Sequence, residues 1–265
     1  MIKRSFSTAA AIVAAVLLFT TTAFAAWYFL KPGEVANKLG NSALSAAFDS
    51  GSAININESV ISGDFTFTLL AIVSGKDISD QPYFNNNELR SDRSYIVTAV
   101  RRADGSPMQE DGIAQFYISP YVKGQKPWLV NAHTLGGGVS EIFADGVIYR
   151  LVEFENITMF ADRGVYIGII DGRFPNNQAF LINEQTGDLS VNPDYDGISV
   201  LFNLPIDSSL ADPEKAQAFL DDLLGDIIIE DEGLNIGGVD SWSVMTEDAA
   251  AGAWTFIVGE DLVSQ

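Results

Sequence analysis

An uncharged apolar run from Ala9 to Leu30 constrains this chain more than any other feature of its sequence. As an α-helix rising about 1.5 Å per residue, these 22 residues would measure about 33 Å, enough to cross a hydrocarbon core of about 30 Å. Lys3 and Arg4 precede the run, and the aromatic residues 27–29 close it. These flanks predict a single membrane span with the N-terminus inside and the rest of the chain outside the cell.

The same segment also fits a secretory signal sequence that is removed after export. Its basic region would be Lys3-Arg4, its apolar region Ala9 to Phe19, and its small-x-small cleavage site Ala23-Phe24-Ala25. Against cleavage, the apolar character continues beyond Ala25 as far as Leu30. A retained anchor and a cleaved signal both stay open, and both place the remaining chain outside the cell.

The exported part is strongly acidic. Thirteen of the 15 Lys and Arg residues and all 35 Asp and Glu residues follow Leu30, which gives that part a formal charge of −22. Its field repels nucleic-acid phosphates and anionic lipid head groups, so we expect neither as a partner of the folded body. The charge favours solubility, and it also favours attraction of cations, basic peptides or polycations.

The rest of the composition is typical of a folded domain without disulfides. About 235 residues follow the run, enough for one large domain or one and a half ordinary ones, and the chain is 47% hydrophobic. It contains no cysteine, which excludes disulfides, thiolate metal sites and cysteine nucleophiles. Stability must therefore come from an ordinary packed core.

The hydrophobic pattern predicts a β-rich body behind a short helical segment. Residues 31–52 predict a helical neck of two short helices, with Pro32 in the first turn and Gly40 as a stop signal. In residues 53–225, short apolar runs recur between turn signals such as Asp145-Gly146, without the intervening helices of βαβ units. Val165 to Ile170 is apolar throughout, as expected of a strand buried on both faces. The pattern predicts an antiparallel β-sandwich.

One longer helix is predicted late in the chain, over residues 212–224. Asp212 is a good N-cap, Pro213 suits the first helical position, and apolar residues then recur at helical spacing up to Leu224. We expect this helix to pack against the sandwich. Residues 226–265 are acidic and rich in glycine and alanine, and we interpret them as a partly ordered appendix.

Several longer phrases resemble a known family. They read FAAWYFLKPGEVANKLG and SALSAAFDSG after the run, then IVTAVRRADGSPM, FYISPYVKGQKPW, FADGVIYRLVE, FADRGVYIGI and LFNLPIDSSLADPEKA. Together they cover about residues 20 to 222 and resemble the uncharacterised membrane-anchored ectodomains of Gram-positive bacteria that occur fused to, or encoded beside, anti-sigma-factor modules. The resemblance implies an immunoglobulin-like ectodomain outside a single span, and it brings no catalytic or ligand-binding residues with it.

The chain departs from the fused members of that family before the span. Those members carry a cytoplasmic segment that can hold a sigma factor, whereas only Met1 to about Thr8 precede the apolar run here. So short a segment cannot bury such a partner. We therefore expect no direct sequestration of a sigma factor by this chain.

Three aromatic residues are candidates for ligand binding. Tyr121, Trp128 and His133, close to the glycine triplet 136–138, could line a groove for a glycan or a peptide. The alternative is an ordinary core tryptophan beside a flexible loop. His133 is the only histidine, and neither a nucleophile elbow nor a carboxylate at telling spacing accompanies it.

The candidate for a cation site is the segment from Asn192 to Gly197. Asn192, Asp194 and Asp196 place side-chain oxygens at positions 1, 3 and 5, with glycine at position 6, as in a calcium-binding loop. The twelfth position, however, is Asn203 rather than glutamate. An ordinary turn stabilised by Asx and glycine residues is the alternative, so we expect no cofactor apart from a possible calcium ion.

Carboxylates in the predicted hairpin raise the question of catalysis. Glu153 and Glu155 alternate and should point the same way, and Glu141 lies on the partner strand. Paired carboxylates about 5 to 9 Å apart can hydrolyse glycosides, but acids facing solvent are far commoner. We therefore expect no enzyme and no catalytic residues.

The sequence predicts a membrane-anchored binding or sensor module at the cell envelope, with an unknown ligand or protein partner. Two alternatives remain: a structural envelope protein that self-associates, and a carbohydrate-active enzyme. A binding module predicts an exposed aromatic or apolar patch, an enzyme predicts carboxylates converging in a deep pocket, and a structural protein predicts association through an edge strand or the appendix.

Overall fold

The computed structural model describes residues 29–75, 92–109, 115–176 and 178–225, together with the backbone of four strands between 228 and 258. The predicted membrane span lies outside these residues except for its last two positions, and so does most of the polar segment after Ser74. Within the described part, no helix has both the length and the apolar character that a membrane crossing requires.

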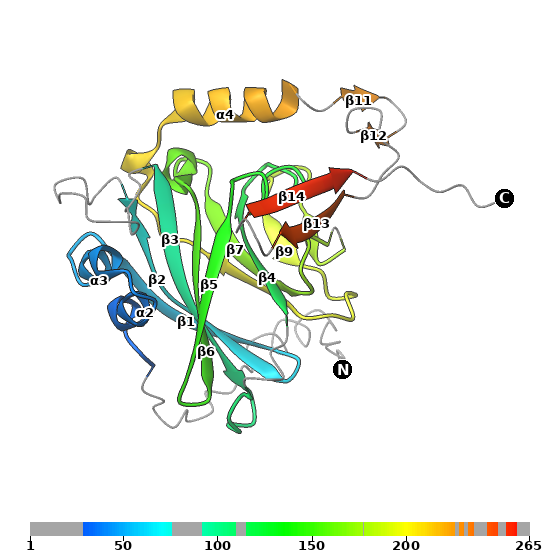
Figure 1. Ribbon diagram of the computed structural model, residues 1–265. Coiled ribbons are helices and arrows are strands. Elements are labelled where there is room, and N and C mark those ends of the chain that lie inside the picture. The colour runs from blue at the N-terminus through cyan, green and yellow to red at the C-terminus, as the bar shows by residue number, and fades with distance from the viewer. Residues whose placement is uncertain are drawn as a thin grey trace, which may run out of the picture. The chain divides into compact units, whose positions relative to one another are not determined.

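Two antiparallel sheets form the body (Figure 1). The first has the order β1-β2-β3-β6-β5, with β1 (Ile54–Ser62), β2 (Phe65–Ser74), β3 (Arg93–Arg102), β5 (Gly138–Ala144) and β6 (Val147–Glu155). The second has the order β10-β7-β4, with β4 (Phe116–Val122), β7 (Val165–Asp171) and β10 (Ser199–Asn203). A short hairpin pairs β8 (Phe180–Ile182) with β9 (Leu189–Val191). The prediction of a mainly β, antiparallel protein is confirmed.

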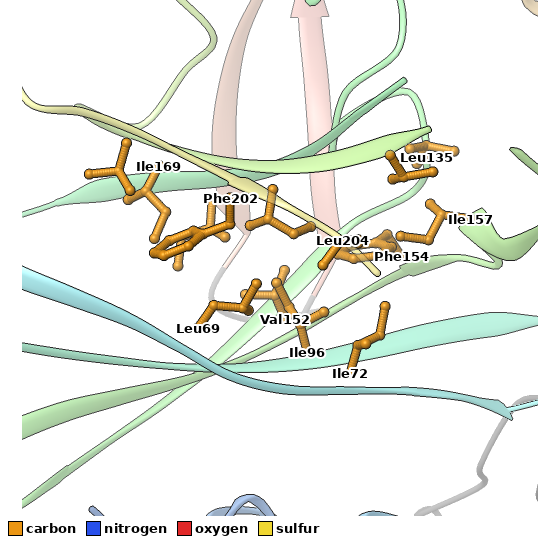
Figure 2. Packing of buried hydrophobic residues seen from close by; sticks show 14 of the residues in the cluster. Leu69, Ile72, Ile96, Leu135, Val152, Phe154, Ile157, Ile169, Phe202 and Leu204 are labelled. Carbon is orange, nitrogen blue, oxygen red and sulfur yellow. The ribbon is translucent and has the colours of Figure 1, made fainter. Parts of the chain in front are cut away.

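The main hydrophobic cluster takes side chains from both sheets. Leu69, Ile96 and Val152 come from the five-stranded sheet, and Ile169 and Phe202 come from the three-stranded sheet (Figure 2). All five are at most 3% exposed. Because successive strand residues point to opposite faces, each strand contributes alternate residues to this cluster.

Strand β7 is buried on both faces, as its apolar run predicts. Val165, Ile167 and Ile169 belong to the main cluster. Ile170, with Tyr166 at its margin, belongs to a second cluster on the other face of the three-stranded sheet. That outer face therefore needs a cover of its own.

The hairpin of β5 and β6 and the two short helices also match the sequence pattern. Asp145 and Gly146 join the strands with φ values of 52° and 74°, the positive values that a tight two-residue turn demands. The helices are α2 (Pro32–Lys38) and α3 (Ser42–Phe48), whose N-cap Asn41 accepts the Leu44 backbone N–H at 2.9 Å. Helix α2 contacts β6 and α3 contacts β2, so both lie against the five-stranded sheet.

The later helix is confirmed as α4 (Pro213–Gly225). Asp212 accepts the Lys215 backbone N–H at 3.1 Å, which satisfies one of the free donors of the first turn. Ala216 and Leu220 enter the main cluster, and Phe219 packs edge-on against Phe160 with ring centroids 6.0 Å apart. The 3-10 helices η3 (Ile157–Phe160) and η4 (Ser208–Leu210) lie between β6 and α4 in the chain.

Four strands follow α4 in two antiparallel hairpins. They are β11 (Ile228–Glu230) with β12 (Gly233–Asn235), and β13 (Ser243–Asp248) with β14 (Ala253–Val258).

Gly168, at the middle of β7, tests the packing of the outer face. A Cβ atom there would clash with Tyr121 Cε2 and would lie 2.8 Å from Phe180 Cζ. We expect Gly168→Ala to lower the free energy of unfolding by about 1–3 kcal/mol, because overpacking forces buried rings to move. Urea denaturation of the full chain in nonionic detergent measures this. The control is Gly51→Ala, since nothing lies within 4 Å of a Cβ at Gly51; equal losses for the two variants would contradict the packing.

Candidate functional site

The outer face of the three-stranded sheet is covered by the loop of residues 123–137 and by the β8–β9 hairpin. On β4, Phe116, Ile118 and Val122 point into the main cluster, whereas the alternate residues Tyr117 and Tyr121 belong to the outer cluster. Ala132 of the loop and Phe180 of the hairpin also belong to that outer cluster. The elements that cover this face supply the candidate functional residues.

Asn131 holds the loop in place. Its side chain is 2% exposed, and its Nδ2 donates to the backbone carbonyls of Pro127 and Trp128, both at 3.1 Å. Its Oδ1 accepts the Tyr117 hydroxyl at 3.2 Å and the His133 backbone N–H at 2.9 Å. A buried amide that makes all these bonds fixes its surroundings, so the loop presents His133 at a defined place.

Tyr117, His133 and Phe174 form a continuous row of rings, which we name the aromatic stack. Tyr117 and His133 lie with centroids 5.1 Å apart and planes at 24°. His133 and Phe174 follow at 5.9 Å and 31°. Burial raises the pKa of Tyr117 to about 12 and lowers the pKa of His133. Phe174 is 48% exposed, so the stack ends in a ring open to solvent.

A surface pocket of about 680 Å³ has Asp171, the last residue of β7, in its lining. We name it the acidic pocket; it is lined by Asp171, Gln178, Leu181, Asn192, Asp194, Tyr195, Asp196 and Gly197. Among the residues that the structure describes, its lining holds three carboxylates and no lysine or arginine. Leu181 is 47% exposed and adds an apolar surface. Such a lining favours a positively charged ligand with some apolar character.

Tyr195 and Asp171 join the two segments that form this pocket. The Tyr195 hydroxyl donates to Asp171 Oδ1 at 2.7 Å and accepts Asn176 Nδ2 at 3.3 Å. Burial and the bond to Asp171 raise the pKa of Tyr195 to about 12, so it stays a neutral donor. Gly197 lies so close that an added Cβ would clash with Asp171 Oδ1 and lie 2.6 Å from Tyr195 Cε1. A glycine is therefore needed there for close packing.

The segment from Asp171 to Asn176 connects the acidic pocket to the aromatic stack. Asp171 lines the pocket, Phe174 ends the stack, and Asn176 bonds Tyr195. The two features together are the candidate functional site. It combines carboxylate and amide groups with exposed apolar side chains, which is the composition of a binding surface.

The predicted ligand-binding aromatics lie in three different environments. Tyr121 is 2% exposed and packs against Phe180 at 5.3 Å. Trp128 is partly exposed, with Lys126 Nζ 4.9 Å from its ring centroid. His133 lies in the aromatic stack. In the described ranges no ring contact joins these three residues to one another. The structure therefore does not bring them together in the shared groove that the sequence predicted.

The predicted calcium ligands form one side of the acidic pocket. Asn192 Oδ1 accepts the Asp194 backbone N–H at 3.0 Å, and Asn192 Nδ2 donates to the Gln178 carbonyl at 2.7 Å. This is the Asx turn that the sequence offered as the alternative. Asp194 and Asp196 are exposed. Over the residues that the structure describes, no group of three or more acidic, histidine or cysteine side chains is placed to hold a metal ion.

The sheet separates Glu141 from Glu153 and Glu155, and Glu141 and Glu153 each pair with an arginine. Glu141 lies opposite Arg150, a residue on the core side of β6, and its Oε2 is 2.5 Å from Arg150 Nε. Glu153 lies on the other face, with its Oε1 3.6 Å from Arg93 Nη2. Glu155, two residues further, shares that face with Glu153. Glu141 therefore does not face the other two across a common cleft.

Sequence reasoning missed Tyr117, Phe174, Asp171 and Tyr195. Tyr117 alternates with Tyr121 in the predicted strand, which places both on one face. Phe174 lies between Gly172 and Pro175, and a segment with these turn residues is expected to run over the surface. Asp171 and Tyr195 are far apart in the sequence, and no local pattern links them.

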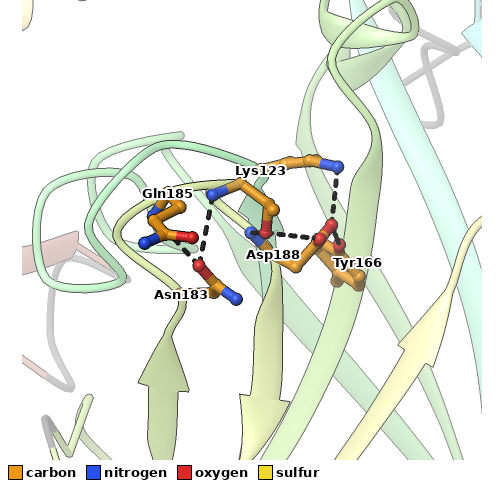
Figure 3. A network of polar contacts seen from close by, with 6 residues as sticks. Lys123, Tyr166, Asn183, Gln185 and Asp188 are labelled. Atoms are coloured by element: carbon orange, nitrogen blue, oxygen red, sulfur yellow. Dashed lines mark hydrogen bonds and ion pairs between the residues drawn. The ribbon is translucent and has the colours of Figure 1, made fainter.

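Asp188 ties the β8–β9 hairpin to the loop that begins at Lys123 (Figure 3). Its Oδ1 is 2.6 Å from Lys123 Nζ and accepts the Tyr166 hydroxyl at 3.3 Å. Its Oδ2 accepts the Thr186 hydroxyl at 2.6 Å. The hydrogen bonds from Lys123 and Thr186 lower the pKa of Asp188.

No match was found when the chain was compared with protein-family models, with curated proteins and with solved structures.

The lowered pKa of Asp188 predicts a pH-dependent contribution to stability. A carboxyl whose pKa is lower in the folded than in the unfolded state stabilises the fold fully at pH values above its unfolded-state pKa, about 3.9. This stabilisation is lost as the pH falls through the folded-state pKa. We expect Asp188→Asn to lower the melting temperature at pH 7 and to leave it unchanged at about pH 2. Thermal melts followed by circular dichroism check this, with the exposed Asp162→Asn as control; a deficit that persists in acid would contradict it.

The aromatic stack predicts the titration of His133. As the only histidine it gives an unambiguous imidazole signal by proton NMR, and its pKa should lie below the ordinary value of about 6.5 because burial disfavours the charged ring. Phe174→Ala removes one neighbouring ring and should raise the pKa toward 6.5. Leu210→Ala, at another exposed apolar position, should leave it unchanged. A wild-type pKa at or above 6.5 would refute this.

Proposed function

We propose that this chain is a membrane-anchored, extracytoplasmic binding or sensor module, without a catalytic step, whose ligand carries positive charge. The observation that carries the proposal is the acidic pocket beside the exposed end of the aromatic stack. Asp171, Asp194 and Asp196 line the pocket together with the half-exposed Leu181, and the half-exposed Phe174 follows Asp171 by three residues in the chain. Ammonium or guanidinium groups suit the carboxylates, and their alkyl stems suit the apolar side chains.

Basic peptides and polyamines are the ligand classes that fit this lining. A cation above the exposed Phe174 ring gains about 0.5–1 kcal/mol from the ring quadrupole. The formal charge of −22 after residue 30 attracts the same ligands over longer distances and speeds their encounter. Specificity comes from the pocket, because diffuse charge alone does not select a partner.

An immunoglobulin-like sandwich is the fold that best accounts for the strand order. Immunoglobulin domains pair their strands as A-B-E-D and G-F-C. Leaving out β3, the observed orders β1-β2-β6-β5 and β10-β7-β4 follow the same scheme. Strand β3 is an addition between B and E. It makes β2 and β6 parallel to each other, since both are antiparallel to β3, whereas B and E are antiparallel in an immunoglobulin sheet. The strand order therefore follows the scheme, and the directions of β6 and β5 relative to β2 depart from it. We propose an immunoglobulin-like variant with an inserted strand.

The apolar run at residues 9–30 supports the membrane location. If this run is retained, it anchors the module in the cell membrane with the binding body outside. If it is cleaved near Ala25, the same body is secreted. The resemblance to ectodomains that accompany anti-sigma-factor modules suggests that binding at the envelope is reported to a sigma factor through a neighbouring protein.

Replacing pocket carboxylates tests the ligand class. We expect the full chain in nonionic detergent to bind an octalysine peptide, and D194N/D196N to weaken binding about ten-fold, since a loss of about 1.4 kcal/mol corresponds to that factor. Raising the salt concentration should weaken binding further. Isothermal titration calorimetry measures both effects.

The matched control is D64N/D162N, which removes the same charge at exposed positions outside the pocket. If that variant loses as much affinity as D194N/D196N, peptide binding depends only on the overall charge of the chain, and the assignment of the ligand to the acidic pocket is wrong. Undetectable binding to the unaltered chain would refute the cationic ligand class altogether.

A further inference from the structure

Strand β5 leaves an open edge in the five-stranded sheet. It ends the strand order, and in the described part of the chain it pairs with β6 alone. The residues flanking the two-residue turn, Ala144 and Val147, exchange hydrogen bonds, and every second pair does so in turn. The backbone N–H groups of Val139, Glu141 and Phe143 therefore point to the open edge, which is a template for a further strand.

The side chains of β5 leave an apolar surface uncovered beside that edge. Val139 is 59% exposed and Phe143 is 36% exposed. They lie opposite Val152 and Ile148, both members of the main cluster, so they face the core side of the sheet.

The three-stranded sheet ends before it reaches β5. Arg150 of β6 donates from NH1 to the Phe116 carbonyl of β4 at 2.9 Å. Strand β4, the outermost strand of its sheet, therefore lies opposite β6. Strand β5 extends beyond it, which accounts for the exposure of Val139 and Phe143.

The β13–β14 hairpin has apolar residues to bury, as the exposed side chains of β5 do. Alternate positions of β14 are Trp254, Phe256 and Val258. A two-stranded hairpin is marginally stable in water unless it packs on another surface or joins a sheet. We propose that the β13–β14 hairpin docks on β5, extends the five-stranded sheet and covers Val139 and Phe143. This inference is independent of the proposed function.

The connection between α4 and β13 is long enough for this docking. Phe219 of α4 packs on Phe160 of η3, and η3 follows the end of β6, where Glu153 pairs with Gly138 at the start of β5. Seventeen residues, 226–242, separate α4 from β13, and nine of them lie outside the β11–β12 hairpin. Nine extended residues span about 30 Å.

Tethering and charge both favour this segment as the occupant. A short linker gives an effective concentration of about millimolar, so the chain's own hairpin competes well against a second copy. Residues 226–265 contain nine acidic residues and no lysine or arginine, so the acidic pocket repels them. Strand β5 holds a single carboxylate, Glu141, which Arg150 pairs at 2.5 Å.

Hydrogen exchange followed by mass spectrometry on the full chain in nonionic detergent tests the docking. We expect the β5 amides to exchange about ten-fold faster in W254S/F256S than in the unaltered chain, because the edge N–H groups lose their partners. Val139→Asp, which alters the β5 side of the proposed contact with the hairpin, should also speed the exchange of the β5 amides. The controls are T255S, at the alternate position of β14, and S140D, which is exposed on the opposite face of β5; both should leave β5 protected.

Unchanged protection of β7 in every variant shows that the body remains folded. The proposal fails if the β5 amides of the unaltered chain exchange as fast as those of W254S/F256S. It also fails if β5 protection survives W254S/F256S and increases with protein concentration, since a second copy then covers the edge and the protein self-associates.

Discussion

Burial of β7 on both faces determines how the rest of this protein is arranged. One face of the three-stranded sheet packs with the five-stranded sheet around Ile167 and Ile169, which is the ordinary way to form a β-rich core. The other face carries Tyr166, Gly168 and Ile170 and cannot be left to water. A loop and a two-stranded hairpin cover it, and these covering elements provide the candidate functional site.

Polar groups make that cover rigid enough to present a surface. Asn131 satisfies its own amide and the backbone around it, and Asp188 joins the hairpin to Lys123. The hydrogen bonds and the ion pair of these two networks order the loop and the hairpin. The covering elements therefore do not need a large apolar core of their own. The outcome is a buried tyrosine, a partly buried histidine and an exposed phenylalanine in one row, with carboxylates beside them.

Local signals in the sequence predicted most of the elements and part of the site, namely His133 and the segment with Asn192, Asp194 and Asp196. Asp145-Gly146 predicted the β5–β6 hairpin and Asp212-Pro213 predicted the start of α4, because a turn or a cap depends on a few adjacent residues. The aromatic stack comes from a strand and two loops, and no periodicity relates those segments. Tyr121 looked like a surface candidate, but its alternation with Ser119 and Tyr117 places it under Phe180. The sequence could not show the pairing of Glu141 with Arg150 and of Glu153 with Arg93, because it depends on strand register and long-range contacts.

The central claim is that the cover of the three-stranded sheet is a binding surface for positively charged ligands. The most direct measurement is a chemical-shift map of the ¹⁵N-labelled full chain in detergent during titration with octalysine. The account predicts shifts concentrated in residues 171–176 and 192–197 and at His133. Shifts spread over all acidic surfaces, or confined to the five-stranded sheet, would contradict it.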